Sequence, residues 1–151
     1  ANINQRSSNG EGVIHSLARS GNPELMTKLL KQYALNVHAK NNLGFQAIHL
    51  AVITNNPEII NLLSQYEASL NAEARDGITP IILAMQLGYY ELIDTLLSSP
   101  AIINYINNQR ISPLYFAVND GNLFLVKKLL HLGAEINLPF TYTQESIVHA
   151  A

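Results

Sequence analysis

The five histidines are the residues best able to do chemistry, because imidazole binds metals and transfers protons near neutral pH. Three of them, His15, His49 and His149, recur at wide intervals, and His38 and His131 have no second ligand at a chelating spacing. The chain has no cysteine, which excludes thiolate metal sites and disulfide bonds. We therefore expect neither a metal site nor a cofactor.

Motifs for catalysis are also missing from the sequence. The serines at 7–8, 20 and 98–99 lack the Gly-x-Ser-x-Gly context of a hydrolase nucleophile. The segment Gly10-Glu11-Gly12 is too short for a phosphate-binding loop and is not followed by Lys-Ser or Lys-Thr. We therefore expect no catalytic residue and no enzyme activity in these 151 residues.

The composition bears on whether the chain binds nucleic acid or a membrane. Of the 151 residues 48% are hydrophobic, enough for the core of one domain, and only 13% are charged, with a net charge of −2 that disfavours nucleic acid as a partner. No apolar run approaches the roughly 18 residues that span a bilayer. The first residues, Ala1-Asn2-Ile3-Asn4, lack the basic and apolar regions of a signal peptide. We expect a cytoplasmic, monomeric protein that binds neither nucleic acid nor membrane.

A six-residue segment recurs along the chain. Taking its fourth residue as a marker gives positions 15, 49, 82, 115 and 149, with steps of 34, 33, 33 and 34 residues. A Gly or Asn follows six residues later at 21, 55, 88 and 121, and a Leu-containing pair follows at 29–30, 63–64, 96–97 and 129–130. The clearest copies are Gln46-Ala47-Ile48-His49-Leu50-Ala51, Thr79-Pro80-Ile81-Ile82-Leu83-Ala84 and Ser112-Pro113-Leu114-Tyr115-Phe116-Ala117.

Local signals predict two short helices in each repeat. Thr79-Pro80 and Ser112-Pro113 place a hydroxyl cap before a proline at the first helical position. Asn22-Pro23 and Asn56-Pro57 give the same start to a second helix, in which apolar residues recur on one face. One such unit cannot bury its apolar face alone, whereas a stack of units can.

The recurring segments resemble the ankyrin repeat family, whose pattern is Thr-Pro-Leu-His-x-Ala followed by Gly, a Leu-Leu pair and Gly-Ala-Asp-Val-Asn. This resemblance implies an all-α solenoid of stacked helix-turn-helix units with short finger loops, forming a single domain over 1–151. The units would be 7–40, 41–73, 74–106 and 107–140, with a partial fifth unit at 141–151. Residues 1–6 read either as the tail of a preceding unit or as a start that only mimics one. Because Ile147-Val148-His149-Ala150-Ala151 is no polar cap, we expect a fragment of a longer protein.

The resemblance also assigns roles to single residues. It implies that His15, His49 and His149 hydrogen-bond along the stack, while Ile82 and Tyr115 interrupt their row. Four residues before the marker, the family exposes a finger residue toward its concave side, and here that row reads Glu11, Phe45, Ile78, Ile111 and Glu145.

The central apolar members of that row predict a binding patch, since apolar patches with a polar rim often mark interaction sites. The alternative is that the fingers fold over and pack these residues together. The predicted patch comprises Phe45, Ile53, Ile78, Leu87 and Ile111, and its polar surround comprises Asn42, Arg75, Asn108, Gln86 and Asn119.

The predicted function is non-catalytic binding of another protein on the concave face formed by the fingers and inner helices, with a scaffolding role. The alternative is a structural spacer within a larger multidomain protein, such as a bacterial effector acting in the host cytosol, whose activity lies outside this segment. The 17 Asn and 16 Ile residues suggest an AT-rich genome, which is compatible with such a source.

Overall fold

The computed structural model describes residues 3 and 5–136, and its described part is helical. It contains nine α-helices and one 3-10 turn, and no strand occurs in the described residues. The predicted partial unit at 141–151, with Glu145 and His149, lies outside the described residues. In chain order the elements are α1 (Val13–Ser20), α2 (Pro23–Gln32), α3 (Ala47–Ile53), α4 (Pro57–Gln65), η1 (Arg75–Gly77), α5 (Pro80–Leu87), α6 (Tyr90–Leu96), α7 (Pro100–Ile103), α8 (Pro113–Asn119) and α9 (Leu123–His131).

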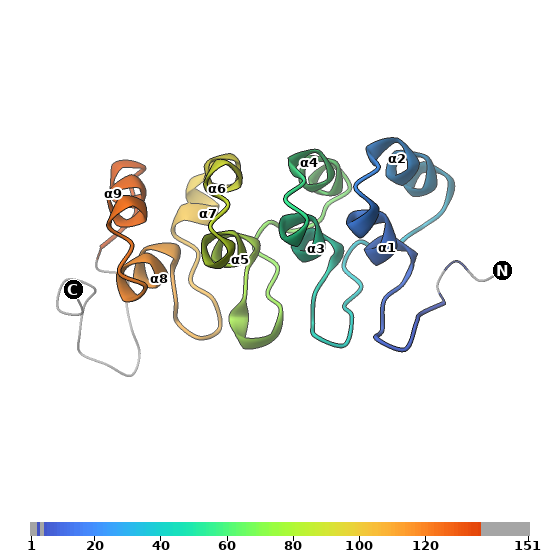
Figure 1. Cartoon of the computed structure of the whole chain (residues 1–151), viewed down its shortest axis with the longest axis horizontal. Coiled ribbons are helices and arrows are strands. Elements are labelled where there is room, and N and C mark those ends of the chain that lie inside the picture. The colour runs from blue at the N-terminus through green and yellow to red at the C-terminus, as the bar shows by residue number, and fades with distance from the viewer. Residues whose placement is uncertain (1–2, 4, 137–151) are drawn as a thin grey trace.

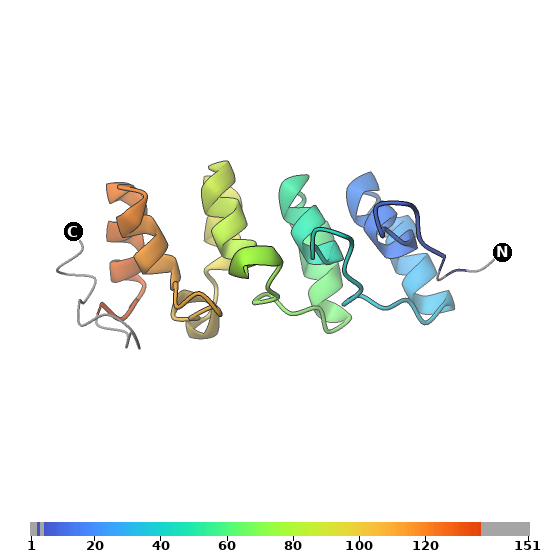
Figure 2. The same cartoon turned by 90° about the horizontal axis from the view of Figure 1, so that it is seen from below.

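Four helix pairs stand in a single row. The inner helices α1, α3, α5 and α8 form one level, the outer helices α2, α4, α6 and α9 lie above them, and loops project below (Figure 1). The view from below shows the same pairs side by side along the long axis (Figure 2). The main helix contacts join partners within a unit or in adjacent units, as expected of a solenoid.

Side-chain caps begin most of these helices, as the sequence predicts. The Oδ1 atoms of Asn22 and Asn56 accept hydrogen bonds from the backbone N–H groups of Leu25 and Ile59, at 3.1 and 3.2 Å. The Oγ of Ser112 accepts from Tyr115 N–H at 3.1 Å. Each bond satisfies one of the N–H groups that the first turn of a helix leaves unpaired.

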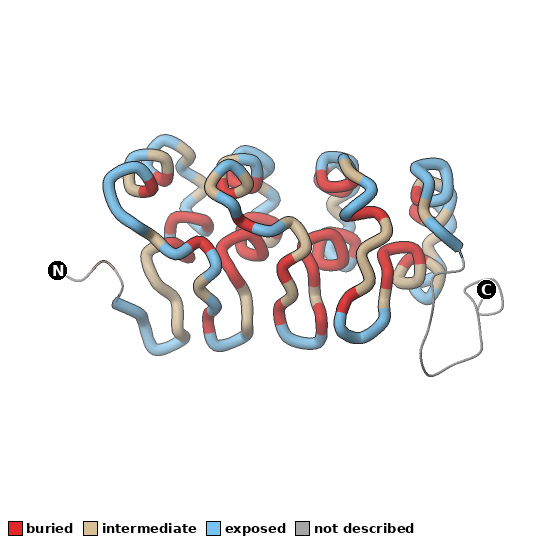
Figure 3. The backbone as a smooth tube through the Cα atoms, turned by 180° about the vertical axis from the view of Figure 1, so that it is seen from behind, coloured by how far each residue is buried: buried red, intermediate tan, exposed pale blue. Residues whose placement is uncertain are grey.

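The apolar core runs continuously between the inner and outer helices (Figure 3). Ala51, Ala84 and Ala117, at one repeat position, have no exposed surface, and their small side chains allow close approach of neighbouring inner helices. The largest fully buried side chains come from both layers. They are Met26, Ile48, Leu50, Ile59, Ile60, Leu63, Ile81, Ile93, Leu96, Leu114, Leu125 and Leu129.

The third unit departs from the repeat pattern in its second half. Its outer helix α6 runs for seven residues, whereas the other outer helices run for nine or ten, and the one-turn α7 follows where the neighbouring units have a turn. Ser98-Ser99-Pro100 separates the two helices because proline supplies no N–H donor and begins helices more readily than it continues them. The periodic pattern did not predict this break.

Candidate protein-binding surface

The residues of the predicted apolar row lie at the ends of four short loops. We call them finger 1 (7–11), finger 2 (41–45), finger 3 (74–78) and finger 4 (107–111). In each finger the first residue donates its backbone N–H to the carbonyl of the last, at 2.8, 2.9, 2.8 and 3.1 Å in chain order. The four last residues therefore hold equivalent positions in successive units. They are Glu11, Phe45, Ile78 and Ile111.

Two buried asparagines hold fingers 2 and 4. The Oδ1 of Asn41 accepts from the N–H groups of Leu43 and Phe45, both at 2.9 Å, and Asn107 Oδ1 makes the matching pair of bonds in finger 4. Their amide nitrogens reach back to the preceding finger: Asn41 Nδ2 donates to Glu11 Oε2 at 3.1 Å and Asn107 Nδ2 to the Gly77 carbonyl at 2.8 Å. Neither asparagine was predicted from the sequence to have a role at this surface.

His15 also joins two successive units. Its Nδ1 accepts from the Gly12 N–H at 3.0 Å, so the proton of the neutral ring sits on Nε2. Nε2 lies 2.9 Å from the Ala39 carbonyl and 3.2 Å from that of Phe45, both contributed by the chain entering and forming finger 2. The expected structural role of His15 is consistent with this geometry.

His49 repeats this arrangement one unit later. Its Nδ1 accepts from the Gln46 N–H at 3.1 Å, and Nε2 lies 3.0 Å from the carbonyls of Ala72 and Ile78. Neither His49 nor His15 has exposed surface, and burial lowers the pKa of both rings. Among the described residues, no three His, Asp or Glu side chains are grouped in a way that could hold a metal ion.

The five predicted patch residues differ in accessibility. Phe45, Ile53, Ile78 and Ile111 are half-buried and pack against the core, and the Phe45 ring lies 5.6 Å from the His49 ring. Leu87, at the end of α5, is 42% exposed. Part of the apolar row therefore serves packing between finger and helix.

Fingers 3 and 4 enclose a hollow of about 230 Å³. Ile78 and Ile111 lie on its wall together with Gln86, so three predicted site residues meet here. Ile82 and Phe116 extend the apolar wall, while Asp76 and Asn107 add polar groups. The hollow is thus an apolar depression with a few polar groups, large enough for a single side chain of a partner.

The polar surround is less closely grouped. Asn42, Arg75, Asn108, Gln86 and Asn119 are all exposed, and of these only Gln86 lines the hollow. Asn42 Nδ2 donates to the Ser8 carbonyl at 3.0 Å, and the Asn108 N–H donates to Glu73 Oε1 at 2.9 Å. Asn42 and Asn108 thus help to join successive fingers.

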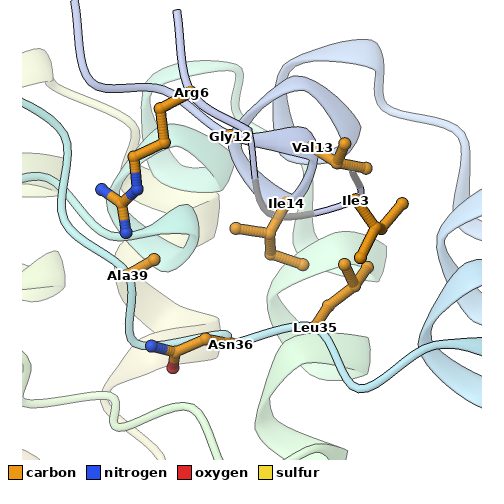
Figure 4. Close-up of a pocket in the computed structure, with 8 residues that line it drawn as sticks. All are labelled: Ile3, Arg6, Gly12, Val13, Ile14, Leu35, Asn36 and Ala39. Carbon is orange, nitrogen blue, oxygen red and sulfur yellow. The ribbon is translucent and has the colours of Figure 1, made fainter. Parts of the chain in front are cut away.

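A second hollow, of about 280 Å³, lies at the N-terminal end of the stack (Figure 4). Ile3, Ile14 and Leu35 form its apolar part. The Arg6 side chain lies on the opposite side and donates to the Lys40 carbonyl at 2.6 Å. The described lining offers no carboxylate, imidazole or hydroxyl group for acid–base or nucleophilic chemistry.

The outer helices carry an exposed apolar cluster that was not predicted from the sequence. Leu123 and Phe124 are 64% and 60% exposed at the start of α9. The Phe124 ring meets the Tyr90 ring edge-on at 5.6 Å, and Lys128 Nζ lies 5.8 Å from the Phe124 centroid. Leu123 and Phe124 are apolar like the buried Leu125 and Leu129 of the same helix, so residue type alone does not reveal that they are exposed.

A family model described as ankyrin repeats (3 copies) matches residues 1–74 and again residues 55–139. The chain belongs to the ankyrin-repeat family. Ankyrin repeats generally mediate protein–protein interaction and are typically non-catalytic. No curated protein matches the chain closely enough to count as a relative. None of the helices in the described ranges has the length and apolarity needed to cross a membrane.

Proposed function

We propose that this ankyrin-repeat chain is a non-catalytic module that binds a protein partner on the face formed by its fingers and inner helices, centred on units 2 to 4. The observation that carries this proposal is the hollow between fingers 3 and 4. Its wall joins Ile78 and Ile111 to Ile82 and Phe116, with Gln86 alongside. An apolar side chain of a partner entering this hollow would leave water, which favours association.

The remaining predicted residues fit around this centre with different roles. Phe45 and Ile78 are the proposed apolar anchors, and Ile53, Leu87 and Ile111 extend the patch. Exposed amide and guanidinium groups can bond a partner's backbone or side chains at the rim. These rim residues are Asn42, Arg75, Gln86, Asn108 and Asn119.

Charge supports a protein rather than a nucleic acid as the partner. Units 2 and 3 (41–106) contain the six acids Glu58, Glu67, Glu73, Asp76, Glu91 and Asp94 and the single base Arg75, a net charge of 1 − 6 = −5. This net negative charge disfavours binding of a phosphate backbone. We also propose that the protein is monomeric and located in the cytosol.

Affinity capture from candidate lysates, followed by mass spectrometry, tests the proposal. The double variant Phe45→Glu, Ile78→Glu is expected to lose the partner that the parent chain captures. Because both side chains are half-buried, circular dichroism and urea unfolding must show that the variant stays folded. Gln86→Arg, which changes an exposed residue beside the hollow, is expected to weaken capture without altering the core.

Phe124→Glu on the outer face is the matched control and is expected to capture the partner normally. Unchanged capture by folded Phe45→Glu, Ile78→Glu and by Gln86→Arg would remove this face as the binding site. Loss of capture only with Phe124→Glu would move the binding site to the outer helices.

A further inference from the structure

Fingers 2 and 3 are each fastened to the preceding inner helix by one histidine. His15 bonds the carbonyls of Ala39 and Phe45, and His49 those of Ala72 and Ile78. We propose that these two histidines form a pH-sensitive latch that releases fingers 2 and 3 in mild acid and leaves finger 4 in place.

The latch follows from the hydrogen bonds of the neutral ring. In His49 the Nδ1 lone pair accepts from the Gln46 N–H, while Nε2 donates to the two carbonyls. A second proton on Nδ1 would face the N–H of Gln46, and two donors cannot bond each other. The charged ring therefore either leaves that N–H without an acceptor or moves and gives up its bonds to the Ala72 and Ile78 carbonyls, of which only Ile78 keeps a second donor, the Ala74 N–H.

Burial makes the charged ring costly in both positions. Neither ring is exposed, so a charge there loses its hydration. The lowered pKa of His15 and His49, caused mainly by burial, agrees with this argument. Once a finger is released, the histidine ring of the helix that held it is hydrated and can take up a proton at its ordinary pKa, so acid favours the released state.

Nearby charges distinguish the two latches. The Glu11 carboxylate favours protonated His15, while the Arg6 guanidinium opposes it. The Lys40 ammonium opposes protonation of His49.

Finger 4 is the internal control. The residue at the marker position of unit 3 is Ile82, which has no hydrogen-bonding side chain. Finger 4 is held instead by Asn107, whose Nδ2 donates to the Gly77 carbonyl, and by the Glu73 carboxylate, which accepts from the Asn108 N–H. The Asn107 side chain has no titratable group.

Acid release would also regulate binding, a consequence that rests on the proposed function. Phe45 and Ile78, the proposed anchors, are the last residues of the two latched fingers. Releasing those fingers would disperse the anchors and lower the affinity for the partner, since binding would then have to order the fingers again.

Hydrogen exchange of the 151-residue chain at pH 7.5 and 5.5, corrected for the intrinsic rate at each pH, tests the latch. The probes are the N–H groups that close the fingers, on Asn41, Ala74 and Asn107. For a histidine that ionises at 6.5 only when released, protection should fall by up to about 10-fold at Asn41 and Ala74. Protection at Asn107 should not change. An equal fall at all three amides, or none at Asn41 and Ala74, would overturn the latch.

A double variant His15→Gln, His49→Gln provides the second test, because glutamine keeps an N–H donor and does not titrate. It should lose the pH dependence at Asn41 and Ala74, and a persistent pH dependence would contradict the proposal. If this variant does not fold, a proton NMR titration of the parent chain decides instead. The His15 and His49 rings should ionise below the ordinary pKa of 6.5, and ionisation of both rings at or above that value would reject the latch.

These measurements need no partner. A negative exchange result would therefore reject the latch and leave the binding proposal standing. Conversely, normal capture by Phe45→Glu, Ile78→Glu would reject the binding face while leaving the latch intact.

Discussion

The imidazole Nε2 of His49 lies 3.0 Å from the carbonyl oxygen of Ile78, twenty-nine residues further along the chain. This hydrogen bond joins the inner helix of unit 2 to finger 3. An equivalent bond joins His15 to Phe45 one unit earlier. In each case a single buried side chain connects a helix layer to the loop of the next layer, which explains why histidine recurs at this repeat position without forming a site of its own.

Removing the His49 side chain should therefore destabilise the stack. His49→Ala leaves the Gln46 N–H and the Ala72 carbonyl without their buried partner and removes one of two donors to the Ile78 carbonyl, and we expect a loss of about 2–4 kcal/mol in the free energy of unfolding. Urea unfolding followed by circular dichroism measures the change. His38→Ala, at an exposed position, is the control and should differ from the parent by less than about 0.5 kcal/mol.

The stability of the chain should fall as the pH is lowered. The pKa of His15 and of His49 is depressed in the folded state, so the unfolded chain binds more protons once the pH drops below the ordinary value of 6.5. Above pH 7.5 both neutral histidines should contribute their full stability. At pH 5 each histidine is expected to lower the free energy of unfolding by up to about 2 kcal/mol compared with pH 7.5. Urea midpoints at both pH values measure this, and a flat profile between them would refute it.

Gln46 occupies a repeat position at which two other units have a residue that caps the following helix. Its side-chain Oε1 is buried without a hydrogen-bond partner, whereas Thr79 and Ser112 at the same repeat position each cap the following helix. Gln46→Thr should supply that cap and remove the unpaired oxygen, raising stability by about 1 kcal/mol. Thermal unfolding compares it with the parent, and Thr79→Ala should lose a similar amount. A lower melting temperature for Gln46→Thr would show that the amide packs better than we infer.

Arg110 has a backbone conformation that suits glycine. Its φ is +64°, and the equivalent residues Gly10, Gly44 and Gly77 all have φ near +75° to +80°. A residue with a Cβ atom is strained in this left-handed region by about 1 kcal/mol, so Arg110→Gly should raise the unfolding free energy by up to that amount. Chemical denaturation provides the measurement, with Arg75→Gly as a control that should not stabilise the chain. Equal effects of the two substitutions would contradict this account.

Much of the fold could be predicted from the sequence because its signals are local and repeated. A hydroxyl or asparagine before proline marks a helix start whatever lies elsewhere in the chain, and Ser112-Pro113 and Asn56-Pro57 begin helices as expected. The early end of α6 and the added turn that begins at Pro100 escaped prediction because the apolar residues of this unit keep the spacing of the repeat. There the proline favours the start of a new helix while the apolar repeat favours the pattern of the other units, and the structure follows the proline.

The site was less predictable because exposure depends on neighbouring layers. The type of residue at 45, 78 and 111 could be read from the repeat, but how far each packs against the core depends on the finger beside it. Asn41 and Asn107 share one repeat position, so a signal for their structural role existed. It was obscured because Ala74 occupies that position in the unit between them.

Since the stack holds together only through neighbours, its response to mechanical force is set by the length of one unit. A pull on both ends would load the interfaces in series, so the weakest interface would yield first and the units would unravel one after another. Each event would release about 33 residues, or roughly 110 Å of extended chain. Stretching this protein should therefore give a staircase of small, nearly equal extensions rather than one large rupture.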